Sequence, residues 1–206
     1  MESEAVTTAA SRLDSAAIGD LAAREQVRHV VAAYARAVDR LDWPLLRGCY
    51  HPDDFDDHGV VSGTVDAVVK HLSEKLPAFE STFHMIGNLT MDTARAQAGE
   101  IAAETYCVAR HHYTNATGPM VLETGVRYVD RFTDRGTGYL IEHRLVVLDW
   151  VHNVAAPDRW AFSGQFRRGT RTGEEPADPS GGFLPCGPRI TPPHPQDTDR
   201  RAPHDD

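Results

Sequence analysis

The sequence predicts an α+β fold, in which helices pack on one face of a curved, mainly antiparallel sheet. Before residue 80 the apolar residues recur every three or four positions, which is the period of amphipathic helices. From Ser81 onward they alternate with polar residues, which is the period of strands. Helices first and long strands afterwards indicate an α+β arrangement rather than an alternating α/β one.

The first helix is expected between Asp20 and Leu41. Asp20 can accept hydrogen bonds from the free amides of the first turn and so cap the start of the helix. The preceding residues are small and polar and Gly19 can break a helix, so residues 1–17 are expected to be a flexible lead or a short extra helix. The predicted buried stripe consists of Val27, Val30, Val31, Tyr34, Val38 and Leu41.

Two shorter helices are expected next. Asp42 can cap the second, with Pro44 in the first turn, where its missing amide is harmless. Thr64 can cap the third, whose apolar positions are Val65, Val68, Val69, Leu72 and Leu76. The run from His51 to His58 between them is rich in acids and imidazoles but lacks the spacing of a known metal site. A solvated loop or an edge strand is therefore expected there, with no metal.

Four strands are expected after the helices. In the first, Phe83, Met85, Leu89 and Met91 are predicted to point one way, and His84, Ile86, Asn88 and Thr90 the other. The other three are expected at about 100–114, 119–133 and 138–152, joined by turns that contain glycine. The folded domain is therefore expected to span residues 18–155. Residues 156–206 are rich in Pro, Gly and charge and are expected to be a mostly disordered or loosely packed extension.

The composition is that of a globular protein and limits the classes of partner. Of the 206 residues, 41% are hydrophobic and 25% are charged, which suits one domain with a real core. The net charge of −9 disfavours nucleic acid and anionic membranes as partners. The start lacks the features of a secretory signal, so a cytoplasmic location is expected. Cys49, Cys107 and Cys186 are expected to be free thiols, and no phosphate-binding glycine loop or nucleophile elbow predicts a cofactor or covalent catalysis.

Four spaced strings of residues resemble the SnoaL-like branch of the NTF2-like superfamily over about residues 18–155. They are Tyr34-Ala-Arg-Ala-Val-Asp39-Arg-Leu-Asp42-Trp43, Thr82-Phe-His84-Met-Ile-Gly-Asn88, Arg127-Tyr128-Val-Asp130-Arg131 and Ile141-Glu-His-Arg144. The superfamily includes scytalone dehydratase, bile-acid dehydratases, hexachlorocyclohexane dehydrochlorinase, ketosteroid isomerase and polyketide cyclases, besides non-enzymatic binding and assembly proteins. The resemblance implies a cone whose helices and sheet enclose one deep, mostly apolar pocket.

The resemblance also implies a site. Asp39 and His84 match the Asp–His dyad of the dehydratases and the dehydrochlorinase, and Tyr34 matches the tyrosine of the bile-acid enzymes. His111 falls where scytalone dehydratase carries a second histidine. The acidic strand residue of the bile-acid enzymes has no counterpart, since Ala109 or Arg110 occupies that region, and no second carboxylic acid of the isomerase kind is found.

The residue types fit this chemistry, although each has a plainer interpretation. A neutral His84 can take a proton if a carboxylate such as Asp39 fixes its tautomer and stabilises the charge it gains. Helical geometry, however, puts Asp39 about 140° around the axis from Tyr34, on the flank of the buried stripe. His84 could equally satisfy a buried hydrogen bond, and Tyr34 could be core packing.

Substrate-binding residues are predicted from strand faces. Ile86 and Asn88 share the face of His84, and of the neighbouring His111 and His112 only one can face the pocket, for which His111 is chosen. Arg144 lies among inward apolar residues and needs a carboxylate, either in a ligand or in the protein. Glu123 and Asp130 are the predicted protein partners.

The expected function is that of a cofactor-independent lyase of the dehydratase type, which acts by His–Asp proton transfer on a hydrophobic polycyclic or aromatic, steroid- or polyketide-like substrate. An isomerase or a polyketide cyclase would use the same residues. A non-catalytic small-molecule-binding or assembly module, or the small subunit of a ring-hydroxylating dioxygenase, would use the fold alone. A homo-oligomer, dimer or trimer, is expected through the exposed sheet face.

Overall fold

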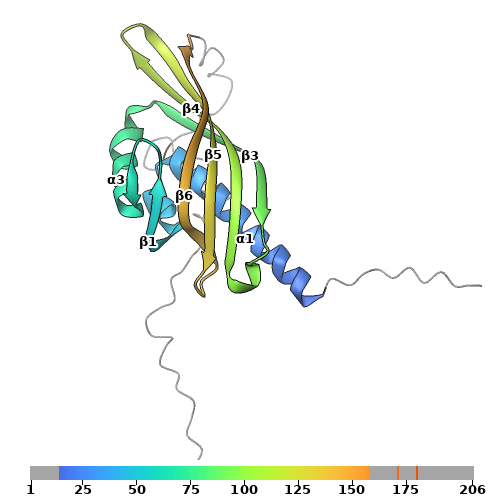
Figure 1. Ribbon diagram of the computed structural model, residues 1–206. Helices are drawn as coiled ribbons and strands as arrows, with labels where there is room; N and C mark the ends of the chain where they lie inside the picture. Colours follow the sequence, from blue (N-terminus) through green and yellow to red (C-terminus); the bar gives the residue numbers. More distant parts are fainter. Residues whose placement is uncertain (1–13, 158–170, 172–179, 181–206) are drawn as a thin grey trace, which may run out of the picture.

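A computed structural model describes residues 14–157, Arg171 and Ser180 of the chain. Its long first helix crosses one face of a six-stranded sheet, and a short helix lies beside the first strand (Figure 1). The helices are α1 (Ser15–Arg40), α2 (Trp43–Gly48), α3 (Val65–Lys75) and the short turns η1 (Leu76–Ala78) and η2 (Ala96–Ala98). The strands are β1 (Tyr50–Asp57), β2 (Ser62–Thr64), β3 (Ser81–Asp92), β4 (Glu100–Asn115), β5 (Gly118–Asp134) and β6 (Tyr139–Ala155).

The sheet has the strand order β2-β1-β6-β5-β4-β3. All neighbouring pairs are antiparallel except β1 and β6, which run parallel. The predicted α+β fold, with its mainly antiparallel sheet, is therefore confirmed, and the three long strands β4, β5 and β6 lie where the alternation of the sequence predicted them. None of the described helices is long and apolar enough to cross a membrane.

Helix α1 begins earlier than predicted. Asp14 caps it and accepts a hydrogen bond from the Ala17 amide at 2.7 Å. Asp20 lies inside the helix, where its carboxylate accepts from the Arg24 guanidinium at 2.7 Å, one turn further on. The predicted cap at Asp20 is wrong because this ion pair and the earlier cap let the helix continue through Gly19. Residues 1–13, most of the predicted lead, lie outside the described part of the chain.

The caps of α2 and α3 are those predicted. The Asp42 carboxylate accepts from the Leu45 amide at 3.1 Å, and the Thr64 hydroxyl accepts from the Ala67 amide at 3.4 Å. The end of α1 is set by Leu41, which has a left-handed φ of 55° and whose amide donates back to the last turn. This sharp end directs the chain into α2 and leaves the last turn of α1 beside β3.

Strand β3 departs from the predicted alternation. Ile86 pairs with Cys107 of β4 but Leu89 pairs with Thr105, so β3 contains one extra residue between these positions. An extra residue of this kind, a β-bulge, reverses which residues face the core from that point on. Leu89 and Met91 therefore pack on the core side like Ile86, and Asn88 is exposed. The prediction that Asn88 shares the inward face of His84 is wrong for this reason.

Strand β1 is neither a solvated loop nor an edge strand. It lies between β2 and β6, and its polar side chains His51, Asp54 and Asp56 are buried. Each of the three has a partner: His51 Nε2 lies 2.9 Å from the Thr133 carbonyl oxygen, Asp54 accepts from Arg135, and Asp56 accepts from the Tyr50 hydroxyl. Because each of these side chains has such a partner, the acidic run can pass through the interior of the sheet.

The core lies between α1 and the sheet. Val27, Val31 and Val38 of α1 are almost fully buried, as are Phe132 and Ile141 on the facing strands. Burying each such side chain contributes roughly 1.5–3 kcal/mol. The predicted extension 156–206 lies almost wholly outside the described residues. Its described members contact the domain, with Arg171 donating to the Phe79 carbonyl at 2.7 Å and Arg36 donating to Ser180 at 3.1 Å.

Candidate active site

One cavity of about 470 Å³ lies between the sheet, α1 and α3. This volume is within the usual range of small-molecule pockets, and the lining is mainly apolar. Aliphatic residues of β4, β5 and β6 form one wall, and α1 and α3 form the others. The lining residues are Tyr34, Val38, His58, Gly59, Val60, His71, Leu72, Lys75, Leu76, Phe79, His84, Ala109, His111, Leu122, Thr124, Val126, Tyr128, Val146 and Leu148.

His84 and Asp39 form a hydrogen-bonded pair at this cavity. Asp39 Oδ1 lies 2.7 Å from His84 Nδ1, and Asp39 Oδ2 accepts from the His84 backbone amide at 2.9 Å. The two side chains are only 8% and 12% exposed. With a carboxylate on Nδ1, the neutral imidazole carries its proton there and leaves the lone pair on Nε2. This is the tautomer that a general base requires.

The electrostatics of Asp39 keep it ionised. Burial raises the pKa of Asp39. The hydrogen bonds that His84 donates, and the charge of His84 when it is protonated, lower this pKa by more, so the pKa of Asp39 lies below its ordinary value. Helical geometry does place Asp39 on the flank of α1, as the sequence indicated. That flank is covered by β3, which contacts α1, and the carboxylate consequently meets His84 instead of solvent.

His111 lies next to His84 on the neighbouring strand. Its ring is 5.4 Å from that of His84, edge to face, and 4.9 Å from that of Phe79. Burial, together with the nearby His84, lowers the pKa of His111 to about 4. His111 therefore stays neutral at neutral pH. As a neutral imidazole in the cavity wall, it can donate or accept a hydrogen bond without competing for the proton that His84 would take.

A buried ion pair supports the tyrosines of the cavity. Arg144 donates to both oxygens of Asp130, at 2.8 and 2.7 Å, and its guanidinium lies 4.1 Å from the ring centre of Tyr34 and 4.2 Å from that of Tyr128. Cation–π stacking on two faces fixes both rings. Arg144 thus pairs with Asp130, one of the two predicted acids, while Glu123 pairs with Arg110.

Tyr34 turns its ring toward the cavity from the middle of α1. It is 1% exposed, and burial raises the pKa of its hydroxyl well above the ordinary value, so the hydroxyl stays protonated. The hydroxyl forms no well-aligned hydrogen bond to any other described residue. The hydroxyl has almost no accessible surface and lies near Arg144, so Tyr34 presents its ring to the cavity.

Not all predicted site residues reach the cavity. Tyr34, His84 and His111 line it, and Asp39 reaches it through His84. Arg144 lies behind Tyr34, Ile86 packs against the core, and Asn88 faces out. These three residues are not among those that line the cavity.

Sequence reasoning missed six polar or aromatic residues of the lining, namely His58, His71, Lys75, Phe79, Thr124 and Tyr128. His58 has a signal that could have been used, because it follows Asp56 by two positions in an extended segment and therefore lies on the same side. Its Nδ1 is 3.4 Å from Asp56 Oδ1. Within the described residues no three His, Cys, Asp or Glu side chains are grouped as metal ligands would be.

The described thiols are not activated for reaction. Cys49 and Cys107 are free and buried, as predicted, whereas Cys186 lies outside the described residues. Burial raises the pKa of Cys49 to about 12 and that of Cys107 to about 11, so both stay protonated at neutral pH.

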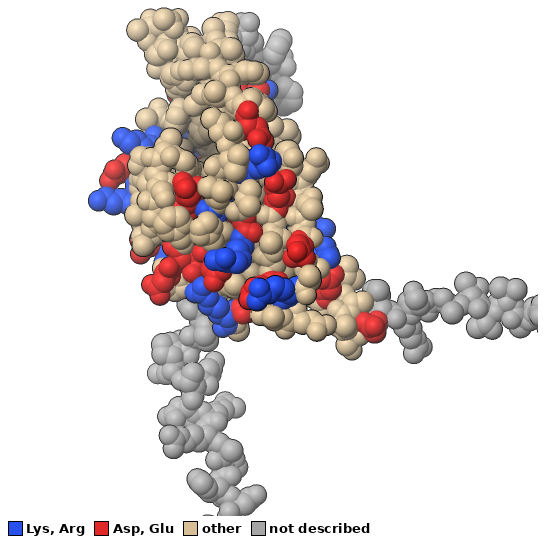
Figure 2. Space-filling view, in the orientation of Figure 1, with Lys and Arg blue, Asp and Glu red and all other residues tan. Residues whose placement is uncertain are grey.

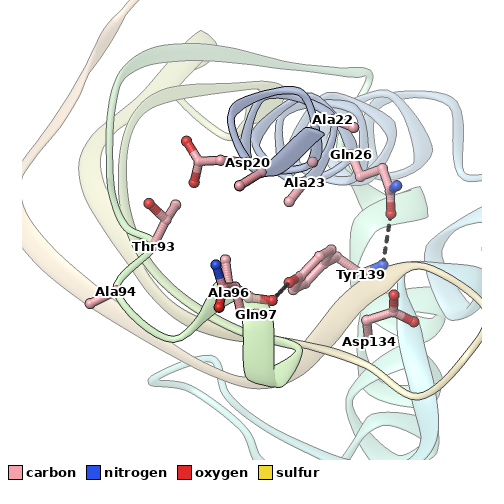
Figure 3. Close-up of a pocket in the computed structure, with 12 residues that line it drawn as sticks. Asp20, Ala22, Ala23, Gln26, Thr93, Ala94, Ala96, Gln97, Asp134 and Tyr139 are labelled. Atoms are coloured by element: carbon pink, nitrogen blue, oxygen red, sulfur yellow. Dashed lines mark hydrogen bonds between the residues drawn. The ribbon is translucent and has the colours of Figure 1, made fainter. Parts of the chain in front are cut away.

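A second cavity, of about 520 Å³, lies at the other end of α1. Asp20, Gln26 and Thr93 line it, and Tyr139 closes one side (Figure 3). Its polar groups largely bond one another, with the Tyr139 hydroxyl donating to the Ala96 carbonyl at 2.8 Å and the Tyr139 amide donating to Gln26 at 3.1 Å. None of its lining residues is an imidazole, whereas His58, His71, His84 and His111 line the first cavity.

Comparison with known proteins agrees with this architecture. The sequence model of the SnoaL-like domain family matches residues 19–145. No curated protein matches the sequence.

Three solved structures illustrate the likeness in fold. A hexachlorocyclohexane dehydrochlorinase (LinA) of type 2 has a TM-score of 0.60 at 13% identity, covering 68% of this chain and 93% of its own. A candidate scytalone dehydratase from Novosphingobium aromaticivorans has a TM-score of 0.58 at 16% identity, covering 76% and 97%. ActVI-ORFA from Streptomyces coelicolor has a TM-score of 0.51 at 17% identity, covering 61% and 97%. Identities this low show a shared fold.

Proposed function

The chain belongs to the SnoaL-like domain family, and on this premise we propose that it is an enzyme that moves a proton within a hydrophobic polycyclic or aromatic substrate. Elimination of water, as in a dehydratase, is the proposed reaction. The observation that carries the proposal is the buried Asp39–His84 pair, which holds an imidazole in the wall of an apolar cavity.

The proposed first step is the transfer of a proton from a substrate carbon to His84 Nε2. Asp39 holds the ring through Nδ1 and stabilises the imidazolium that forms. The electrons of the broken C–H bond form a double bond, and the neighbouring carbon–oxygen bond breaks. The departing hydroxyl takes up one proton, which the protonated His84 can return, and leaves as water. Isomerisation or cyclisation would share the first step and differ in where the proton and the electrons go next.

Tyr34 and His111 would bind the oxygen of the substrate. The Tyr34 hydroxyl is protonated and would reach the substrate after a small shift of its ring, and the neutral His111 lies beside His84. The ion pair of Arg144 and Asp130 would keep Tyr34 and Tyr128 rigid beneath the ligand. A prepositioned donor near the reacting oxygen stabilises the charge that develops there.

A non-catalytic binding module is the alternative, and two observations disfavour it. In such a module the imidazole and the carboxylate need not be within hydrogen-bond reach, and side chains could fill the cavity. Here the two groups are 2.7 Å apart, and about 470 Å³ remains open beside His84.

The test uses a substrate that needs little more than a base in an apolar pocket. In 5-nitrobenzisoxazole, loss of one carbon-bound proton breaks the N–O bond and releases a coloured cyanophenolate. The wild-type protein should accelerate this reaction, and His84→Gln should lower kcat/KM by about 10²–10⁴-fold. His152→Gln, an exposed histidine of β6, is the matched control and should have no effect. An inactive wild type, or full activity in His84→Gln, would refute the proposal.

A homo-oligomer is proposed through the outer sheet face. Charged side chains are interspersed over its lower half in Figure 2, whereas the upper end, where β4 and β5 protrude, is largely uncharged. Exposed apolar residues of the outer face near this end include Trp150 and Val154, at 38% and 53% exposure. A patch of this kind marks an interface. Sedimentation should give a dimer or trimer that Trp150→Asp with Val154→Asp dissociates, and a wild-type monomer would contradict the proposal.

A further inference from the structure

The cavity has a second imidazole–carboxylate pair besides His84 and Asp39. His58 follows the end of β1 and lines the cavity, and its Nδ1 lies 3.4 Å from Asp56 Oδ1. Asp56 is buried, with its side chain 1% exposed, whereas the His58 side chain is 20% exposed. The carboxylate is thus held in the interior, and the imidazole extends from it to the cavity.

Asp56 is fixed by a network that leaves one oxygen for His58. The Tyr50 hydroxyl donates to Asp56 Oδ2 at 2.6 Å, and Tyr50 is itself buried. The nearby Arg144 already gives two hydrogen bonds to Asp130. A buried carboxylate needs a compensating positive charge. Besides the nearby Arg144, the group that contacts Asp56 and can carry such a charge is the imidazole of His58.

The turn that carries His58 is itself well fixed. The His58 amide donates to the Val61 carbonyl at 2.8 Å, and the Gly59 amide donates to the Asp57 carboxylate at 3.1 Å. Gly59 has a φ of 77°, a conformation that glycine adopts without strain. The imidazole of His58 is therefore presented to the cavity from a defined backbone.

The two pairs face the cavity from different parts of the sheet. His84 is on β3, the edge strand, whereas His58 follows β1, and the sheet order puts β6, β5 and β4 between these two strands. A ligand in the cavity would thus have one imidazole at each side. One proton can leave the ligand toward β3 while another enters it from the end of β1.

We propose that His58 is a second catalytic residue, which donates a proton to the departing oxygen of the substrate while His84 takes a proton from carbon. Asp56 is its positioning residue. This inference rests on the proposed function and deepens it, because it predicts that the abstracted proton and the leaving group lie on opposite sides of the substrate.

Loss of water by this route conserves electrons and protons. The C–H electrons become the double bond, the C–O bond breaks, and the oxygen takes the Nε2 proton of His58 and leaves as water. His84 ends as imidazolium and His58 as neutral imidazole, so the number of protons on the protein is unchanged. Solvent at the partly exposed His58 can then restore the starting protonation.

The experiment compares two probes that differ in how much their leaving oxygen needs a proton. The nitro group of 5-nitrobenzisoxazole stabilises the departing phenolate, and unsubstituted benzisoxazole lacks this stabilisation. His84→Gln should slow both probes by the same factor. His58→Gln should slow the unsubstituted probe about tenfold more than the nitro probe, as expected for loss of a general acid. Asp56→Asn, which keeps the imidazole, should shift the same ratio in the same direction but less.

His71→Gln is the matched control. His71 is a histidine of the same cavity, and no carboxylate among the described residues lies within ion-pair distance of it. The His71→Gln variant should leave the ratio of the rates for the two probes unchanged. An unchanged ratio in both His58→Gln and Asp56→Asn, or an equal shift in His71→Gln, would overturn the inference alone. Retained activity in His84→Gln would instead overturn the proposed function.

Discussion

Replacing Asp39 by Asn tests how the carboxylate controls His84. The carboxylate accepts two hydrogen bonds from the same residue, from the ring Nδ1 at 2.7 Å and from the backbone amide at 2.9 Å. An amide of the same shape has one oxygen and one NH₂ group. If its oxygen keeps the backbone amide, its NH₂ group faces Nδ1, and the imidazole must move its proton to Nε2. His84 then has no lone pair toward the cavity.

The size of the effect follows from losing the general base while the cavity is kept. We expect kcat/KM for 5-nitrobenzisoxazole to fall by about 10²–10⁴-fold. In transition-state free energy this loss corresponds to roughly 3–5 kcal/mol. Initial rates measure the loss, and ¹⁵N NMR of the imidazole measures the tautomer. Activity within about threefold of wild type, or a His84 ring that keeps its proton on Nδ1, would refute the reasoning.

Acid unfolding of the same variant gives an independent check. Because the pKa of Asp39 is depressed in the folded protein, its contribution to stability is present above its ordinary pKa, near 4, and is lost as the pH falls through the lowered value. The free energy of unfolding, measured by urea at several pH values, should therefore decline more steeply below pH 4 in the wild type than in Asp39→Asn. Equal slopes would show that the pKa is not depressed.

Three further predictions concern the rest of the site. Arg144→Met leaves the Asp130 carboxylate buried without its partner and should lower the free energy of unfolding by about 3–5 kcal/mol, as measured by urea titration. A loss under 1 kcal/mol would contradict the buried ion pair. His111 should stay neutral down to about pH 4 in an NMR titration of its ring, and a midpoint above pH 6 would show that it is not buried beside His84 as described. Asn88→Ala should change neither kcat nor KM by more than about twofold, since the side chain is exposed on the far side of a bulge, and a larger loss would return Asn88 to the site.

The helices and the long strands could be predicted because each depends on local pattern. Thr64 and Asp42 cap helices through bonds within their own turn, and period-two alternation marks β4 to β6 without reference to other elements. For Asp39 the local pattern gave the flank of the helix, and the resemblance to known dehydratases supplied its partner.

The remaining features depend on contacts between distant segments. The bulge that turns Asn88 outward is set by pairing with β4, and a single strand pattern does not contain that information. The acidic run of β1 resembles a solvated segment until Tyr50, Thr133 and Arg135 are seen to satisfy it. The His58–Asp56 pair has a local spacing of two residues, but the sequence does not show that β1 is buried and that His58 borders a cavity.

The central claim is that His84, held by Asp39, is a base that faces a ligand in the apolar cavity. A crystal structure with the cyanonitrophenol product of the nitro probe tests it most directly. The account predicts the product in this cavity, with a reacting atom within hydrogen-bond distance of His84 Nε2 and Asp39 still bonded to Nδ1. A product bound elsewhere, or an Asp39 side chain turned to solvent, would contradict it.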